Sequence, residues 1–329
     1  MAKKIIKRLL MSLASLFVIS IISFALMQLA PGGPMAMYAE NPKISAADRE
    51  RIKVQLGLDK PAHIRYLIWV RNLLRGDLGI SYKTGRPVAE EIAERLPATL
   101  KLMFVSFLIS IGIAIPVGIY SATHRYSLLD YGVTFGSFLG ISLPVFWFGL
   151  LMIYVFALWT GWLPVGGYLT PWFSPEDYPV LIRPFTVLWE HLRYMILPAV
   201  VLGLYNTASW SRYMRSSMLE VINQDYIRTA RAKGLPERMV LLKHALRNAL
   251  TPIITLMGLE LPLFFGGAVV TETIFAWPGM GRLFYMSVNA RDYQVLMGIQ
   301  IITAVLVLAG NFLADILYAV LDPRVKYEG

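Results

Sequence analysis

The chain contains no cysteine, which excludes disulfide bonds, thiolate nucleophiles and cysteine-ligated metal sites. Its four histidines are scattered and none stands in an HExxH arrangement, so metal chemistry has no support in the sequence. Charged residues are also scarce, at 16% of the chain against about 25% in a soluble domain. A hydrophobic fraction of 56% and a mean hydropathy of +0.55 accompany this scarcity. The composition therefore indicates a polytopic membrane protein.

Several apolar stretches are long enough to cross a bilayer, which requires about 20 residues per helix. They are residues 9–29, 99–121, 132–159, 192–210, 251–276 and 295–320. The first follows the basic residues Lys3, Lys4, Lys7 and Arg8, as a secretory signal core would. It is longer than such a core and has no A-x-A cleavage site, so we predict an uncleaved span. The sequence thus predicts an all-α polytopic membrane protein with six transmembrane helices.

The basic residues predict the orientation, because short cytoplasmic loops carry an excess of lysine and arginine. With the N-terminus inside, Arg125, the cluster from Arg212 to Arg247, Arg324 and Lys326 all fall on the cytoplasmic side. Few basic residues remain for the short external loops: Arg183, Arg193, Arg282 and Arg291. Both termini are therefore predicted to be cytoplasmic. This topology and anionic lipid account for the net charge of +10, and nucleic-acid binding is not expected.

Residues 30–98 form a predicted external region that is too long for a simple connector. Ser45 fits the N-cap of one helix, and Pro61 opens a second that ends near Gly76. Two interpretations stay open for this region: a small lid on the membrane surface, or a docking platform for an external partner.

Small residues recur at four-residue spacing within two spans, which allows helix backbones to approach closely. The stripes are Gly132, Gly136 and Gly140, and Ser106, Ser110, Ala114 and Gly118. Prolines interrupt several spans, at positions 116, 144, 198 and 262, and such interruptions suit a bundle that lines a cavity. The stripes predict packing and no chemistry.

The most informative passage lies between the fourth and fifth spans. Residues 218–233 are predicted to form a helix, Gly234 fits its left-handed cap, and Pro236 fits the first turn of a second helix toward Asn248. An interfacial amphipathic connector is one interpretation of this passage. A sharply turned pair instead projects a knob from the cytoplasmic surface, which favours a contact with another protein.

This passage, DYIRTARAKG followed by KHALRNALTPIIT, resembles the cytoplasmic loop of permeases of bacterial ABC importers, in their dipeptide, oligopeptide and nickel branch. The resemblance extends to LAPGGP, SFLGISLPVFWFGL, ETIFAWPGMGRLF and NFLADILYAVLDPR, and so covers nearly the whole chain. Against the wider importer consensus, Gly234 and Leu246 are kept, whereas Arg228, His244 and Arg247 depart from it. These departures resemble the peptide branch's own version of the loop.

The resemblance implies a type I ABC importer permease fold in a bacterial or archaeal cytoplasmic (inner) membrane. Residues 1–98 would hold the first helix and the external region, 99–320 a five-helix core with a coupling loop at 211–250, and 321–329 a cytoplasmic tail. The implied contact with a separate ATPase comprises Arg228, Thr229, Ala230, Arg231, Ala232, Lys233, Gly234 and Leu235.

The resemblance also implies the partners of the chain. These are a second homologous permease subunit, two ABC ATPase subunits, an extracytoplasmic solute-binding protein and membrane lipid. The chain has no G-x-x-x-x-G-K-[ST] phosphate loop, so ATP and magnesium are expected on the ATPase subunits, with no cofactor on this chain and no catalysis by it.

Polar residues inside the spans are the candidates for a translocation pathway. They are Asn206, Thr207, Ser209, Glu260 and Asn311, with Glu272 as a candidate external gate that solvent alone could satisfy. Glu260 lies near mid-span, where it either faces the cavity and meets a peptide amino terminus or is a paired structural carboxylate.

The predicted function is that of a permease subunit for di- and oligopeptides. The same class of importer carrying oligosaccharides or nickel chelates is an alternative. An ion-driven secondary transporter is less favoured, because the spans offer few proton or sodium relays. A structural scaffold is less favoured because of the turned helix pair.

Overall fold

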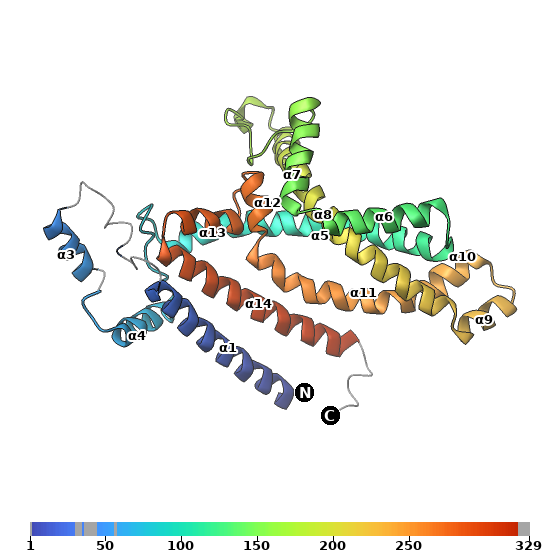
Figure 1. Ribbon diagram of the computed structural model, residues 1–329, viewed down its shortest axis with the longest axis horizontal. Coiled ribbons are helices and arrows are strands. Elements are labelled where there is room, and N and C mark those ends of the chain that lie inside the picture. Colours follow the sequence, from blue (N-terminus) through green and yellow to red (C-terminus); the bar gives the residue numbers. More distant parts are fainter. Residues whose placement is uncertain (1, 30–34, 36–44, 56–57, 322–329) are drawn as a thin grey trace. The chain divides into compact units, whose positions relative to one another are not determined.

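A computed structural model describes all residues except 1, 30–34, 36–44, 56–57 and 322–329, and the described chain is built of helices (Figure 1). It divides into two compact units. One contains residues 1–98 with 279–329, and the other contains Thr99–Pro278. The predicted cytoplasmic tail, 321–329, falls almost wholly outside the described residues.

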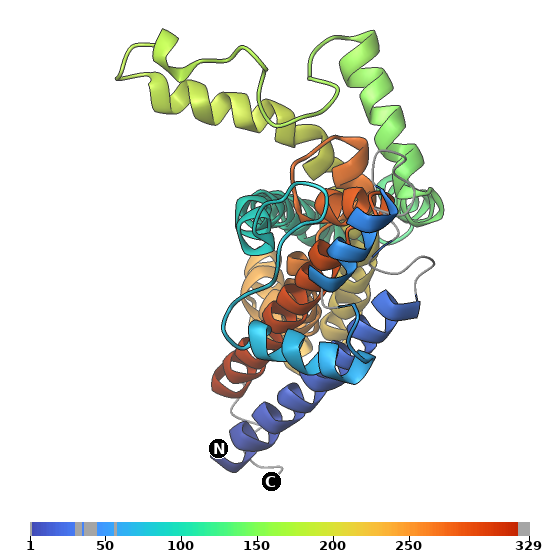
Figure 2. The same cartoon turned by 90° about the vertical axis from the view of Figure 1, so that its left-hand side faces the viewer.

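In the first unit, α1 (Ala2–Leu29) packs along α14 (Tyr293–Leu321), and α4 (Ala62–Leu73) lies against the C-terminal part of α1 (Figure 2). The ring of Tyr66 meets Phe24 edge to face, and its hydroxyl lies 2.8 Å from the Oγ atom of Ser20. Arg65 donates a hydrogen bond to the side-chain oxygen of Gln28 at 2.6 Å. These contacts fix α4 on the first helix.

The predicted external region has the local structure that its sequence predicts. Ser45 caps α3 (Ala46–Gln55) by accepting the Asp48 amide at 3.1 Å, and Pro61 precedes α4. Gly76, just past α4, has φ of +82°. The turn before α5 is anchored by buried Asp292, which accepts the Ser81 hydroxyl at 2.6 Å and the Lys83 amide at 3.1 Å.

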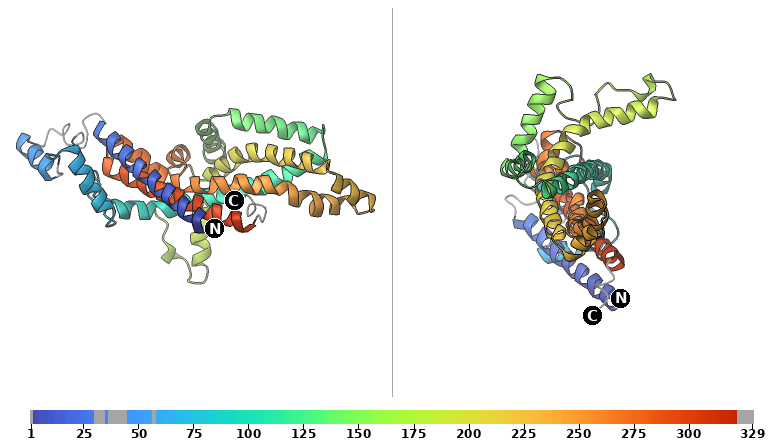
Figure 3. Two further views of the ribbon diagram at one scale, coloured as in Figure 1. Left: turned by 90° about the horizontal axis from the view of Figure 1, so that it is seen from below. Right: turned by 90° about the vertical axis from the view of Figure 1, so that its right-hand side faces the viewer.

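The second unit contains most of α5 (Val88–Thr123), then α6 (Leu128–Ser142), α7 (Val145–Ile153), α8 (Arg183–Ile222) and α11 (Leu246–Glu260). Both α6 and α11 pack on α8, and the three run alongside one another (Figure 3). A π-helical segment, Tyr154–Trp159, extends α7, and a short 3-10 helix, Pro175–Asp177, precedes α8.

Six continuous spanning helices are not confirmed. Within the described residues, four helices are long and apolar enough to cross a bilayer, or five if the bent pair α6 and α7 is one span. That pair bends by 104° where Leu143 is extended before Pro144, because proline disfavours a helical conformation in the residue that precedes it.

The predicted fifth span, 251–276, is not one helix. After α11 the chain forms a 3-10 segment, Leu261–Gly266, and only then α12 (Val269–Ile274). Pro262 sits in the first turn of this segment and cannot donate to the helical ladder. Gly267 has φ of +72°, which ends the helical path.

The two small-residue stripes behave differently. Ser106, Ser110 and Ala114 are buried, and a Cβ on Gly118 would lie 2.5 Å from the Cβ of Met214, so this stripe lets α5 and α8 approach closely. In the other stripe only Gly140 approaches a neighbour, at 3.0 Å from the Cβ of Ala208. Nothing lies within 4 Å of a Cβ built on Gly132 or Gly136.

Candidate functional site

The turned helix pair forms one end of the second unit (Figure 1). Helix α8 stops at Ile222, α9 covers Asp225–Ala232, and α10 (Glu237–Met239) leads through a π-helical segment, Val240–Ala245, into α11. Gly234 has φ of +76°, so the predicted left-handed turn is confirmed. From here on, the name coupling loop, predicted for residues 211–250, refers to the part between α8 and α11, residues 223–245.

Two details of the predicted helix pair are wrong. Residues 218–233 are not one helix, because Gln224 adopts an extended conformation (φ −72°, ψ 150°) that separates α8 from α9. Pro236 is the N-cap residue of α10, one position before the first turn, with ψ of 138°.

The inner face of the coupling loop is packed against the rest of the unit. Ile227 and Ala230 are 0% and 6% exposed. They join a cluster of buried apolar residues from α8 and α11 that includes Met214, Met218, Val240, Ala245, Ala249 and Ile253. Asn248 donates to the Tyr226 hydroxyl at 2.8 Å, and Ser217 donates to the Ala249 carbonyl at 2.8 Å. Helix α9 is therefore packed firmly against the two helices that flank it.

The residues predicted to contact an ATPase divide between the two faces. Ala230 is buried and Leu235 packs partly against the same cluster, so these two support the turn from within. The others are exposed: Arg228, Thr229, Arg231, Ala232, Lys233 and Gly234. Arg228 pairs with Asp225 at 3.5 Å, but both side chains are largely solvated, and such a pair contributes at most about 1 kcal/mol.

Arg231 closes the turn by pairing with Glu237 across Gly234. Its Nη2 atom lies 2.7 Å from Oε1 of Glu237, and its Nε atom donates to Oε2 at 3.1 Å. This hydrogen bond lowers the pKa of the Glu237 carboxyl. The pair therefore stabilises the turn above the ordinary carboxyl pKa, and that contribution is lost as pH falls through the lowered value.

The sequence places Met239 and Leu242 on one face of the second helix but does not reveal that they are exposed, at 42% and 50%. Tyr226 is 43% exposed, and we call these three residues the apolar patch. The π-helical segment turns Val240 and Ala245 inward and leaves Leu242 outside. Exposed apolar side chains beside a basic turn are typical of a protein contact.

A second feature that the sequence did not reveal is a hydrogen-bond network around Asp130, which reaches the C-terminal part of α8. Asp130, which is buried, accepts two hydrogen bonds from Arg215, from Nε at 2.8 Å and from Nη2 at 3.0 Å. It also accepts the Ser121 hydroxyl and the Tyr126 amide. Tyr126 has φ of +62°. The carboxylate thus joins α5, the loop after it, α6 and α8 in one network.

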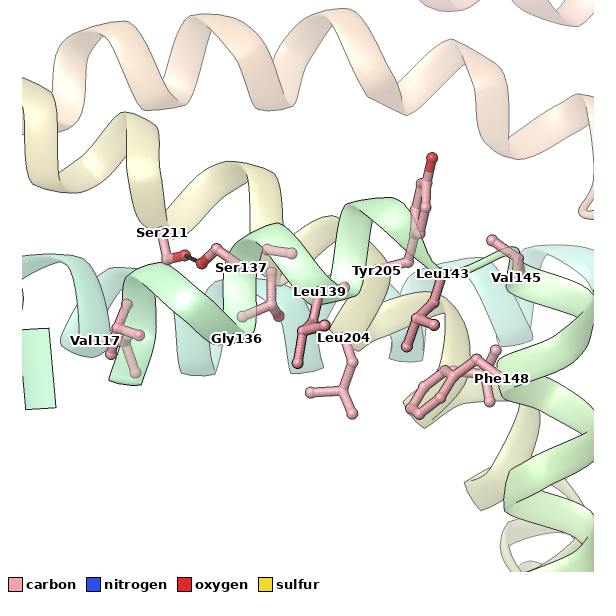
Figure 4. A pocket seen from close by; sticks show the side chains of 15 residues that line it. Val117, Gly136, Ser137, Leu139, Leu143, Val145, Phe148, Leu204, Tyr205 and Ser211 are labelled. Carbon is pink, nitrogen blue, oxygen red and sulfur yellow. Dashed lines mark hydrogen bonds between the residues drawn. The ribbon is translucent and has the colours of Figure 1, made fainter. Parts of the chain in front are cut away.

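The pathway candidates on α8 are not equivalent. Thr207 is buried, donates to the Gly203 carbonyl at 2.8 Å, and lines an apolar cavity of about 350 Å³ between α6 and α8 (Figure 4). Ser137 and Ser211 face each other in this cavity, with 3.3 Å between their Oγ atoms. Asn206 and Ser209 do not line it.

Asn311 lies in the first unit, in a depression between α1 and α14 that Arg8, Ser12 and Ser15 also line. The pathway candidates on α8 and α11 belong to the second unit. The sequence therefore grouped residues that the structure places in separate units.

Glu272 is 0% exposed and accepts the Thr99 hydroxyl at 2.8 Å. The expectation that solvent alone satisfies this carboxylate is therefore wrong. A gate role for Glu272 stays a prediction.

Glu260, at the end of α11, is half-buried and accepts a hydrogen bond from the indole Nε1 atom of Trp210 at 3.0 Å. The Trp210 ring packs edge to face on Phe107, which also meets Phe264. No basic side chain pairs with Glu260 in the part of the chain that the structure describes.

We expect Glu260→Gln to lower substrate-stimulated ATP hydrolysis of the assembled complex while leaving assembly and thermal stability near wild type. The glutamine oxygen can still accept the indole proton, and a neutral amide is cheaper to bury than an ion. Lost assembly with unchanged turnover in the surviving complexes would contradict a pathway role. Glu260→Leu, which cannot accept the indole proton, is the matched control for stability.

Helices that are apolar and long enough to cross a bilayer, and a turned loop packed against α8 and α11, are the features of a multi-pass membrane protein. The chain belongs to the family described as the inner membrane component of binding-protein-dependent transport systems, which matches residues 114–327. The N-terminal membrane component of such systems matches residues 1–103. The protein is thus a multi-pass inner-membrane permease.

Curated relatives match over nearly their whole length. The oligopeptide transport system permease protein AppB of Bacillus subtilis (strain 168) is 50% identical over 328 residues, covering 99% of this chain and 100% of the relative. A putative peptide permease protein of Brucella suis biovar 1 is 42% identical, covering 99% of each chain. The di/tripeptide transport system permease protein DppB of Pseudomonas aeruginosa (strain UCBPP-PA14) is 38% identical, covering 98% of each.

Proposed function

We propose that this chain is one permease subunit of an ATP-driven, binding-protein-dependent importer of di- and oligopeptides, and that it forms half of the translocation pathway. The observation that carries the proposal is the coupling loop, with a buried inner face and an exposed basic and apolar outer face. The names of the relatives, which include oligopeptide and di/tripeptide permeases, support a peptide cargo.

The partners in this proposal are a second homologous permease subunit, two ATPase subunits and an extracytoplasmic solute-binding protein. ATP and magnesium bind the ATPase subunits, and this chain binds no cofactor and performs no catalysis. Closure of the ATPase pair displaces α9, and the buried cluster carries that displacement into α8 and α11.

The size of the required energy favours a packed contact over a few ion pairs. Shifting a two-state bundle from 1:99 to 99:1 takes about 5.5 kcal/mol of differential interaction. One exposed ion pair supplies at most about 1 kcal/mol. The apolar patch of Tyr226, Met239 and Leu242 provides the area that such a contact needs, with Arg228 and Lys233 beside it.

The proposal is tested by purifying this chain with its cognate subunits and measuring ATP hydrolysis. We expect the ATPase subunits to co-purify, and hydrolysis to rise when peptide-loaded binding protein is added. Met239→Asp with Leu242→Asp should abolish co-purification. Val54→Asp with Leu74→Asp, which changes two exposed apolar residues outside the predicted spans and far along the chain from the loop, controls for a general effect of two added charges. Retained co-purification of the loop variant would contradict the assigned contact.

The proposed topology places both termini and the coupling loop in the cytoplasm and Lys60 outside. Because the chain has no cysteine, single cysteines report without background. We expect Lys233→Cys to react with an impermeant thiol reagent only from the cytoplasmic side and Lys60→Cys only from the outside. Both side chains are exposed. The reverse labelling would overturn the orientation.

A further inference from the structure

Helix α8 carries polar residues on two different faces. On the inner face, three hydroxyls have a protein partner: Thr207 bonds the Gly203 carbonyl, Ser211 lies against Ser137, and Ser217 bonds the Ala249 carbonyl. These hydroxyls are satisfied within the bundle and are not available to a ligand.

The other face carries Asn206, Ser209, Tyr213 and Ser216, which we call the polar ladder. Their spacing of three, four and three residues places them in one row along the helix. None of the four side chains donates or accepts a hydrogen bond among the residues that the structure describes. Exposure increases along the row toward the coupling loop, from half-buried Asn206 and Ser209 to Tyr213 at 52% and exposed Ser216.

The close approaches of neighbouring helices to α8 are made at residues outside the polar ladder. Helix α5 approaches at Gly203 and Met214, α6 at Ala208, and α11 at Trp210 and Ser217. In hydrocarbon, each unsatisfied polar group costs several kcal/mol. Asn206 and Ser209 lie in the predicted span, 192–210, so these two groups face water or a polar ligand when the protein is in the membrane. Tyr213 and Ser216 continue the row beyond the span, on the predicted cytoplasmic side.

We propose that the polar ladder is the surface that contacts the backbone of the cargo peptide as it crosses the membrane. This inference rests on the proposed peptide-import function. An amide, two hydroxyls and a phenol offer donors and acceptors without ionised groups, which matches the N–H and C=O groups of a peptide. The ladder therefore recognises what all peptides share and is indifferent to the charge of their side chains.

The dimensions agree with this assignment. Ser216 lies ten positions after Asn206 on the helix, a rise of about 15 Å. An extended peptide rises about 3.3 Å per residue, so the ladder spans about four or five residues of cargo. A packed helix–helix contact, by comparison, is enriched in small residues that let backbones approach, whereas Tyr213 projects a large ring from the middle of this row.

Single cysteines at the four ladder positions test the proposal in the complete transporter, reconstituted with the second permease, the ATPases and the binding protein. We expect Asn206→Cys, Ser209→Cys, Tyr213→Cys and Ser216→Cys to react with a small hydrophilic thiol reagent. Trialanine, supplied with binding protein and ATP, should slow that reaction at least about fivefold, the equivalent of one net hydrogen bond at each site. Thr207→Cys, on the buried face, should stay unreactive with and without peptide.

Three results would overturn the inference. Unreactive ladder cysteines would mean that the row faces lipid or the second permease. Reactivity without protection by trialanine would mean that the row is wet but not in contact with cargo. Loss of the second permease from complexes of the ladder variants would make the row a subunit interface.

A specificity variant separates this inference from the proposed function. Asn206→Asp introduces a charge into the neutral row, so uptake of an anionic peptide should fall relative to a cationic one by at least about fivefold. Equal uptake of both peptides by the variant would overturn the ladder while leaving peptide import intact. Failure of the unchanged complex to take up either peptide would instead refute the proposed function.

Discussion

Gly234→Val is expected to reduce ATP-coupled transport by about tenfold or more, while the protein still inserts in the membrane and binds the second permease. Gly234 has φ of +76°, and no atom lies within 4 Å of a Cβ built on it. The penalty therefore comes from the backbone alone, at about 1–2 kcal/mol for an L-residue and more for a β-branched one. Relief of this strain alters the angle between α9 and α10.

Gly76→Val is a matched control for this prediction. Gly76 also follows a helix, has φ of +82° and has open space around it, but it lies in the predicted external region, away from the coupling loop in the sequence. Gly234→Asn is a second control, because asparagine tolerates the left-handed conformation and should keep most of the coupling. Wild-type uptake by the valine variant would refute the role of this turn.

Arg215→Ala is expected to destabilise the assembled protein by about 3–5 kcal/mol, because it leaves the buried Asp130 carboxylate without its charged partner. The side chain of Asp130 is 4% exposed and that of Arg215 is 31% exposed, so the carboxylate cannot recover its hydration. The measurement is the thermal midpoint of the purified complex and the yield of assembled subunits.

Arg228→Ala is the corresponding control, since its pair with Asp225 is solvated on both sides and should leave the midpoint unchanged. The double variant Asp130→Asn with Arg215→Met removes both charges and should recover part of the loss. A single Arg215→Ala variant with the wild-type midpoint would mean that the network around Asp130 does not hold α6 against α8.

Local signals made the turn in the coupling loop predictable. Gly234 and Pro236 restrict the backbone by themselves, so the position of the turn followed from the sequence. The break at Asn223 and Gln224 did not, because neither residue forbids a helix and the apolar pattern continues across them. The π-helical segment depends on the fit of Val240 and Ala245 into the buried cluster, which a sequence pattern does not encode.

Hydropathy overestimated the regularity of the spans. It counts apolar residues and is insensitive to Pro262 and Gly267, which divide the predicted fifth span. Within α8, polarity identified Asn206, Thr207 and Ser209 together, although Thr207 bonds its own helix and the other two have no protein partner among the described residues. Only three-dimensional packing separates these cases.

The driving force of transport tests the central claim most directly. The complete complex is reconstituted in vesicles, with binding protein and labelled trialanine on one side and ATP on the ATPase side. We expect accumulation that requires ATP, stops with a non-hydrolysable analogue and persists when an ionophore removes the membrane potential. Accumulation without ATP that collapses with the ionophore would contradict the account and identify an ion-driven transporter.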